Sequence, residues 1–377
     1  MPQARGSGAI NGTMKQQAGD KIAAIQLLRA LAAITVAAGH IAFAFADHIG
    51  PGLGLAAIWR GDIPGQLAVM LFFILSGHVM VLAAAGQFGQ PGARWLFWRR
   101  RFIRIMPPYW LATLLLAAIF LTLFPTPIDG GKLAKSLALI PYWPDTVYLR
   151  PMPFLWVGWT LFYEMTFYFV FGLFLAWPRQ QALLGVAAVL AGLVIAGTWV
   201  PPVNPFLFAL TRPVSVMFAA GMAIALWRTG GGTAPAWLRW LALAASAAAL
   251  WLVPFPPQAS AMGWDYLAWC GVPALLIAFA ALGGPLTLPG AHLINRAGDI
   301  SYAVYLLHVP IAWFWLWFWG LVPGFDAGPW EYFVSAMLAT VALGWLFHVR
   351  VERPMTLALN RRLAAPHSDK ELHRKTP

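Results

Sequence analysis

Residues 27–45 read LLRALAAITVAAGHIAFAF, an apolar run that holds only two strongly polar side chains, Arg29 and His40. The run belongs to an apolar stretch at about residues 22–45, which is longer than the core of a signal peptide and has no convincing cleavage site. We therefore expect a first membrane span that is retained. The number of similar stretches then decides the fold class.

The composition is that of a chain folded largely in lipid. Of its 377 residues, 60% are hydrophobic and only 10% are charged, too few charges to cover a soluble globule. Nine further apolar stretches, each close to the ~20 residues that a bilayer core requires, lie at about residues 63–85, 107–124, 155–177, 181–200, 211–228, 236–255, 265–283, 300–321 and 331–349. The sequence predicts an all-α, polytopic transmembrane helix bundle of about ten spans.

The domain organisation is simple. Residues 1–20 are polar and rich in glycine and are expected to form a disordered cytoplasmic segment. Residues 21–355 are expected to form one transmembrane domain, and residues 356–377 a basic cytoplasmic tail. Internal repeats are not evident, and no polar stretch is long enough for a second domain.

The basic residues predict the orientation. With a cytoplasmic N-terminus, 19 Lys and Arg residues fall on the cytoplasmic side and 5 on the other, leaving Arg29 within a span. Such an excess is typical of cytoplasmic loops, so both termini are expected in the cytoplasm. A basic face beside anionic lipid also explains the net charge of +12 without nucleic acid. The expected location is the inner, or cytoplasmic, membrane of a cell.

Several kinds of site have no sequence signal. Cys270 is the single cysteine and lies in an apolar span, which excludes an internal disulfide and favours core packing. The sequence has no Gly-rich phosphate loop, no cluster spaced for metal ligands and no GxSxG nucleophile motif. No metal and no bound cofactor are expected.

Arg29 and His40 are the first candidates for a functional site. They are eleven positions apart, close to three helical turns, so both project from one face about 16 Å apart along the helix axis. Ionisable residues within a membrane span favour a functional interpretation. In the alternative interpretation, Arg29 extends to lipid headgroups and His40 bonds a neighbouring carbonyl.

A second candidate is the basic stretch RWLFWRRRFIRIMPPYW at residues 94–110. Arg100, Arg101 and Arg104 are expected to share one helical face in a cytoplasmic loop, and Pro107-Pro108 to start the next span. Such a cluster suits a polyanionic ligand. It equally suits an anchor on anionic lipid.

The third candidate is Glu164, within the apolar stretch PMPFLWVGWTLFYEMTFYFVFGLF at residues 151–174. An ionised carboxylate there is costly, so it should be paired, hydrated or protonated. By depth it could lie near His40 and orient the imidazole. A structural ion pair with another helix is the alternative.

Weaker signals come from polar residues in other spans. Ser76 and Gly77 form a small-residue pair that indicates close helix packing. Tyr302, Tyr305 and His308 recur at three-residue spacing, a pattern more typical of core aromatics than of a site. Glu352 could pair with a basic loop residue.

Taken in order, six of these motifs make the chain resemble the acyltransferase-3 family of integral membrane acyltransferases. The motifs are RALAAITVAAGH at 29–40, FFILSG at 72–77, RRFIRIMPPYW at 100–110, GWTLFYEMTFYF at 158–169, ISYAVYLLH at 300–308 and VERP at 351–354. The resemblance covers about residues 25–354. The stretches IQLLRALAA at 25–33 and VGWTLFYEMTFY at 157–168 are similar to the branch of the family that acetylates exopolysaccharides. Met70 and His78 depart from the family pattern, which often has an acidic and an aromatic residue at these places.

The resemblance implies transfer of an acyl group, usually acetyl, from cytosolic acetyl-CoA to a sugar hydroxyl of an extracytoplasmic or lipid-linked polysaccharide. His40 would be the general base, oriented by Glu164. Arg29 and the three arginines at 100, 101 and 104 would bind the acyl-CoA phosphates. Further candidates for the pocket are Ser76, Tyr163, Tyr168, Tyr302 and His308.

The resemblance also bears on partners and on rival functions. The expected partners are acyl-CoA, the glycan acceptor, the lipid bilayer and proteins of polysaccharide assembly. A transporter or flippase of lipid-linked sugar would also use intramembrane charges, but the sequence has no evident inverted repeats. A non-catalytic scaffold would leave Arg29 and His40 unexplained.

Overall fold

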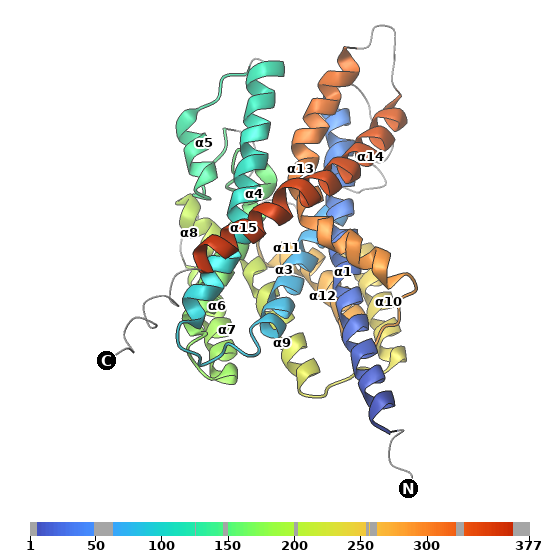
Figure 1. Cartoon of the computed structure of the whole chain (residues 1–377). Coiled ribbons are helices and arrows are strands. Elements are labelled where there is room, and N and C mark those ends of the chain that lie inside the picture. Colours follow the sequence, from blue (N-terminus) through green and yellow to red (C-terminus); the bar gives the residue numbers. More distant parts are fainter. Residues whose placement is uncertain are drawn as a thin grey trace, which may run out of the picture.

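A computed structural model describes residues 6–48, 63–124, 126–145, 150–199, 203–253, 256, 262–321 and 328–364. This part of the chain is a bundle of helices without strands (Figure 1). The α-helices are α1 (Gly6–His48), α3 (Ile63–Ala83), α4 (Ala93–Leu123), α5 (Gly130–Leu137), α6 (Trp159–Phe174), α7 (Arg179–Ala196), α8 (Pro205–Leu210), α9 (Val216–Thr229), α10 (Ala236–Leu252), α11 (Trp264–Tyr266), α12 (Val272–Leu282), α13 (Ala291–Gly320), α14 (Pro329–Phe347) and α15 (Arg353–Ala364). Short 3-10 turns at Trp156–Gly158 (η1) and Pro213–Ser215 (η2) precede α6 and α9, and π-helical segments at Leu267–Gly271 and His348–Glu352 precede α12 and α15.

Apolar helices confirm the predicted multi-pass bundle. Nine helices of the described residues are long and apolar enough to cross a membrane, and α10 is a shorter apolar helix. Each of the ten apolar stretches of the sequence corresponds to one of these ten helices. The side on which the termini lie stays a prediction.

The boundaries of the predicted disordered segment and basic tail also stay predictions. Residues 1–5 and 365–377 lie outside the described part, as do the side chains of residues 6–22. The helix α1 begins at Gly6 and α15 ends at Ala364.

One prediction about α4 is wrong. Pro107 and Pro108 do not start a new helix but lie inside α4, which runs from Ala93 to Leu123 without a break. A proline within a helix removes a backbone hydrogen bond, and a membrane helix tolerates this where neighbouring elements supply polar partners. The carbonyls that lose their helical donors are those of Ile103 and Arg104, four residues before the two prolines, and Tyr302 of α13 donates to the next carbonyl, that of Ile105, at 2.9 Å. The arginine cluster and the span are therefore one rigid element.

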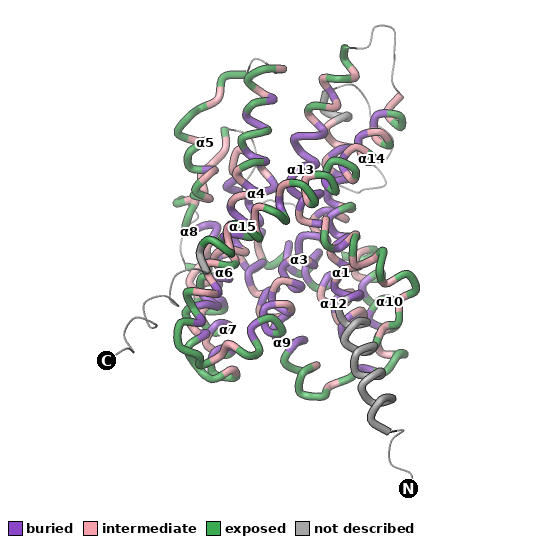
Figure 2. Tube along the Cα trace, viewed as in Figure 1, coloured by how far each residue is buried: buried purple, intermediate pink, exposed green. Residues whose placement is uncertain are grey.

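The close packing predicted from Ser76-Gly77 joins α3 to α9. A Cβ added at Gly77 would lie 2.0 Å from the carbonyl oxygen of Phe218, and one added at Gly221 would lie 1.9 Å from that of Ile74. Reciprocal glycines thus let the two backbones touch, as small residues do in membrane bundles. Buried residues fill the middle of the bundle around this contact (Figure 2).

The two ends of the bundle can be told apart by the connections. We call the end where α4 begins the arginine end, and the end that carries α5 the α5 end. At the arginine end, Gly89 before α4 donates to the carbonyl of Leu175 after α6 at 2.9 Å. At the α5 end, Trp143 before α6 donates to the carbonyl of Val203 before α8 at 3.0 Å. Helices α6 and α9 therefore both run from the α5 end to the arginine end (Figure 1).

The surroundings of Cys270 and Glu352 indicate structural roles. Cys270 is fully buried in the π-helical segment before α12, consistent with core packing. Glu352 bonds His348 of its own chain segment at 2.9 Å rather than a basic loop residue. Residues four apart are neighbours on a helix surface, which explains this pairing.

Candidate functional site

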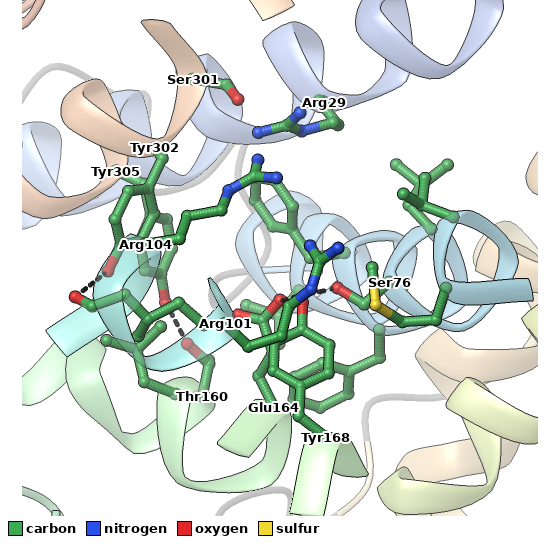
Figure 3. A pocket seen from close by; sticks show the side chains of 18 residues that line it. Arg29, Ser76, Arg101, Arg104, Thr160, Glu164, Tyr168, Ser301, Tyr302 and Tyr305 are labelled. Carbon is green, nitrogen blue, oxygen red and sulfur yellow. Dashed lines mark hydrogen bonds between the residues drawn. The ribbon is translucent and has the colours of Figure 1, made fainter. Parts of the chain in front are cut away.

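Three arginines from two helices converge on one cavity, which we call the arginine pocket. Arg29 enters from α1, and Arg101 and Arg104 enter from the first turns of α4. Figure 3 shows the three guanidinium groups directed into the pocket above Glu164. The other polar side chains that line it are Ser76, Thr160, Glu164, Tyr168, Ser301, Tyr302 and Tyr305, and apolar residues of α3, α4 and α6 complete the wall.

Glu164 is held at the base of this pocket by two hydroxyl groups. The Ser76 hydroxyl donates to Glu164 Oε1 at 2.9 Å, and the Tyr168 hydroxyl donates to the same oxygen (Figure 3). Two donors on one oxygen fix the carboxylate and offset its desolvation. Ser76 and Tyr168, both expected near the site, therefore act on Glu164.

The charges of the pocket do not balance. Three guanidinium groups face one carboxylate, and within the described residues none of the three makes an ion pair. Arg29 donates to the neutral Gln26 Oε1 at 3.3 Å, and Gln26 in turn donates to Asp299 at 2.7 Å. Arg101 lies over the rings of Phe97 and Tyr168, at 5.5 and 5.7 Å. Excess positive charge in a partly buried cavity favours a polyanionic ligand.

Arg100 does not take part in this arrangement. It is exposed on α4 and is not among the residues that line the pocket. Of the three arginines expected to act together, the structure brings two to Arg29 and turns the third away. Tyr302 lines the pocket while its hydroxyl bonds the carbonyl of Ile105.

His40 is paired with His308. Nδ1 of His40 lies 2.8 Å from Nε2 of His308, and Nδ1 of His308 lies 3.3 Å from the carbonyl oxygen of Val304. His308 is fully buried in α13, whereas His40 is partly buried. The edge of the Trp156 ring faces His40, with 6.5 Å between ring centroids.

This hydrogen-bond chain fixes the tautomers of both rings in their neutral forms. A carbonyl only accepts, so Nδ1 of His308 must donate to Val304 and its Nε2 must accept. Nδ1 of His40 then donates to His308, which leaves the lone pair of His40 on Nε2. The pair therefore presents His40 with an unprotonated nitrogen, as a general base requires.

Glu164 and His40 have different partners. The sequence placed Glu164 beside His40 by depth alone, but the structure gives that position to His308 and binds Glu164 to Ser76 and Tyr168. Tyr305 joins the two sets of residues: it lines the arginine pocket, and its ring lies 6.0 Å from that of His308. Its hydroxyl is held by Thr160 at 2.7 Å.

Tyr163 lies outside the arginine pocket. It lines a separate cavity together with Trp159 and Met262, and its ring packs against Phe73 at 5.7 Å. Helical spacing explains the difference, because Tyr163 is adjacent to Glu164 and so projects about 100° away from it. Arg150, one of the five basic residues expected on the side opposite the cytoplasm, is 9% exposed.

Comparison with known proteins decides the family. Residues 22–349 match the family model described as "Acyltransferase domain" (Acyl_transf_3), which is most of the chain. The chain belongs to the acyltransferase-3 family. It is thus a multi-pass membrane acyltransferase, and the predicted resemblance is confirmed.

Curated relatives of this acyltransferase-3 protein agree with the assignment. It is 32% identical over 254 residues to the "Exopolysaccharide production protein ExoZ" of Rhizobium meliloti, covering 65% of this chain and 75% of that protein. It is 30% identical to "Acyltransferase MdmB" of Streptomyces mycarofaciens, covering 89% of this chain and 92% of the relative. "Protein 2 in picA locus" of Rhizobium radiobacter is 34% identical over 152 residues, or 35% of this chain and 76% of that protein. No solved structure shows significant similarity to the chain.

Proposed function

We propose that this acyltransferase moves an acetyl group from cytosolic acetyl-CoA to a sugar hydroxyl of an extracytoplasmic or lipid-linked polysaccharide in the inner membrane. The observation that carries the proposal is the unbalanced arginine pocket next to a histidine base. The relative named for exopolysaccharide production supports a glycan acceptor. Proteins of polysaccharide assembly are the proposed partners.

The arginine pocket is the proposed donor site. CoA carries several phosphate charges, and planar guanidinium groups bind phosphate oxygens by paired, charge-assisted hydrogen bonds. Arg101 and Arg104 stand at the arginine end of α4, where an anion made in the cytosol would enter if the positive residues mark the cytoplasmic side. Arg29 lies on the wall shared with α1, along which the pantetheine arm would extend.

His40 is the proposed base. Arg29 and His40 lie about 16 Å apart along α1, so a donor bound by its phosphates at Arg29 can place its thioester near His40. Nε2 of His40 takes the proton of the sugar hydroxyl while that oxygen attacks the thioester carbon. When the carbon–sulfur bond breaks, the CoA sulfur receives the proton back from His40, and acetylated sugar and free CoA remain.

His308 supports this chemistry as a positioning residue. It accepts from Nδ1 of His40 and so holds the tautomer whose lone pair is on Nε2. Once His40 is protonated, the same hydrogen bond becomes charge-assisted and stronger. Glu164, with Ser76 and Tyr168, balances part of the positive charge of the donor pocket instead of orienting His40.

Acetyl-CoA turnover tests the proposal. The purified full chain in lipid nanodiscs is incubated with acetyl-CoA labelled in the acetyl group, and CoA release is followed with and without polysaccharide. His40→Ala should reduce turnover by about a hundredfold or more, the usual contribution of a general base, while binding of CoA persists. The exposed His292 provides the matched control, and His292→Ala should have no effect.

Two results would contradict the proposal. If wild-type protein binds no CoA, the arginine pocket has another ligand. If His40→Ala turns over acetyl-CoA as fast as wild type, the base is elsewhere. A transporter of lipid-linked sugar would release no CoA under any of these conditions.

A further inference from the structure

A second buried guanidinium group lies at the α5 end of the bundle. Arg150 is 9% exposed, and its Cζ lies 4.4 Å from the centre of the Trp159 ring. Within the described residues it makes no ion pair, and its buried Nε has no hydrogen-bond partner. A buried charge of this kind is costly unless something balances it.

Tyr163 adds an unused donor beside it. Its side chain is 4% exposed, and among the described residues its hydroxyl has no hydrogen-bond partner. The Tyr163 ring lies 5.8 Å from the ring of Trp159, which Arg150 covers, and the charges of both Arg150 and Arg212 act on its hydroxyl. Tyr163 and Trp159 also line one cavity, whose wall includes Pro151 next to Arg150 in the chain.

Arg212 completes the cluster from the segment between α8 and α9. Its Nε donates to the carbonyl of Phe208 at 3.1 Å and its Nη2 to the hydroxyl of Thr211 at 3.4 Å, while the guanidinium lies over the Phe208 ring at 4.4 Å. These contacts fix its position but supply no negative charge. Among the described residues of this end, the ion pair of Lys132 with Asp145 involves neither arginine.

The sequence makes two buried arginines at this end unusual. Basic residues were expected to be few on the side opposite the cytoplasm, and those that only mark topology stay in exposed loops. Arg150 and Arg212 instead turn into the bundle, Arg150 almost completely and Arg212 in part. An arginine that is turned into the bundle without a negative charge from the protein indicates a ligand that carries the negative charge.

The cluster lies next to the base on the side away from the donor pocket. The positive charge of Arg150 acts on the His40 ring. Trp156 faces His40, and Trp159, three residues later, lies under Arg150. A ligand held at Arg150 would therefore meet His40 from the α5 end, as the acceptor must.

We propose that Arg150, Arg212 and Tyr163 bind an oxyanion substituent of the acceptor sugar and thereby hold a neighbouring hydroxyl at His40. The acceptor is accordingly an acidic sugar unit. Its negative charge comes either from a carboxylate within the glycan or from a phosphate that links the sugar to a lipid carrier. This inference rests on the proposed function, since it assigns the acceptor of the same reaction.

Binding to the full chain in nanodiscs tests the inference. Saturating CoA occupies the arginine pocket, and sodium glucuronate, glucose 1-phosphate and glucose are titrated at constant ionic strength. Saturation-transfer NMR gives each dissociation constant. We expect glucuronate or glucose 1-phosphate to bind at least about tenfold more tightly than glucose, the effect of one charge-assisted hydrogen bond. Preference for glucuronate assigns a glycan carboxylate, and preference for glucose 1-phosphate assigns a carrier-linked phosphate.

Variants locate the binding. Arg150→Gln, Arg212→Gln and Tyr163→Phe should each weaken binding of the anionic sugar and leave binding of glucose and CoA unchanged. Arg150→Lys keeps a cation over Trp159, so it should fold even if Arg150→Gln does not. It lacks the planar guanidinium fork and should also weaken binding of the anionic sugar. Lys135→Gln, at an exposed basic residue of α5, is the matched control.

The outcomes separate this inference from the proposed function. If glucose binds as well as the two anions, or if all three substitutions leave anion binding intact, the acidic-acceptor site is wrong and the donor chemistry stands. If wild-type protein neither binds CoA nor turns over acetyl-CoA, the proposed function fails. Anion binding at Arg150 measured without CoA would then report a site with another role.

Discussion

At the scale of single residues, the chemistry depends on which nitrogen of His40 carries its proton. The carbonyl of Val304 sets the tautomer of His308, and His308 sets that of His40. Carboxylates commonly hold a catalytic histidine in this way, and here a second histidine does so. The arrangement predicts that His308 affects the rate of the chemical step more than substrate binding.

Two substitutions of His308 separate this role from packing. His308→Leu removes the acceptor for His40 Nδ1 and should lower kcat about a hundredfold, with little change in the KM for acetyl-CoA. His308→Gln has a similar size and retains a carbonyl oxygen that can accept the same hydrogen bond, so it should recover much of the rate. Steady-state kinetics on both variants provides the measurement. Equal losses in the two variants, or a rise in KM alone, would show a purely structural histidine.

Neighbouring arginines of α4 give a second comparison. Arg101→Gln removes a guanidinium from the donor pocket and should raise the KM for acetyl-CoA about tenfold. Arg100→Gln removes the same charge from the exposed side of the helix and should leave KM unchanged. The assay is acetyl-CoA turnover over a range of donor concentrations. A similar rise in both variants would mean that the cluster attracts CoA through net charge rather than through a shaped pocket.

The sequence predicted part of the site and missed part of it for physical reasons. The spacing of Arg29 and His40 fixes their shared face on α1, because one helix determines it. The partner of His40 depends on which helices are neighbours, and depth in the membrane does not determine that, so Glu164 was favoured over His308. For the same reason, the sequence did not reveal which of Arg100 and Arg101, adjacent residues that project about 100° apart, points into the bundle.

At the scale of elements, the contact between α3 and α9 holds the pocket wall in place. Ser76, which bonds Glu164, is adjacent to Gly77, where the backbone of α9 approaches most closely. Any shift of α3 relative to α9 would therefore move Ser76 in the donor pocket.

This contact predicts a large effect of one methyl group. Gly77→Ala would place a Cβ 2.0 Å from the Phe218 carbonyl, so the helices must separate, at a cost of about 1–3 kcal/mol. Gly192→Ala in α7 meets nothing within 4 Å and serves as the control, expected to be neutral or slightly stabilising. Thermal unfolding of both variants in detergent gives the comparison. A Gly77→Ala protein as stable as wild type would mean that the helices pack less closely than described.

Helix positions were the most predictable feature of the fold. Hydropathy identified the ten apolar helices of the described residues, because a membrane span needs about 20 apolar residues whatever its neighbours are. The start of α4 was mistaken because Pro107 and Pro108 are strong helix-start signals in water. Inside a bundle, packing against neighbouring helices lets a helix continue through prolines, and α4 packs against α13 here.

At the scale of the whole molecule, positive charge gathers at two places on opposite sides of His40. The arginine pocket lies towards the arginine end, and Arg150 with Arg212 lies towards the α5 end. With the arginine end in the cytoplasm, the donor would enter from inside the cell and the acceptor from outside. Only the acetyl group would then pass from one side of the membrane to the other.

Sealed proteoliposomes test whether the acetyl group passes across the bilayer. The protein is inserted in one orientation, acetyl-CoA with a labelled acetyl group is enclosed on the side of the arginine end, and exopolysaccharide freed of acetyl groups by mild alkali is added on the other side. We expect labelled polysaccharide in the outer solution with wild-type protein and none with His40→Ala. Label that appears only when both substrates share one compartment would contradict transfer across the bilayer.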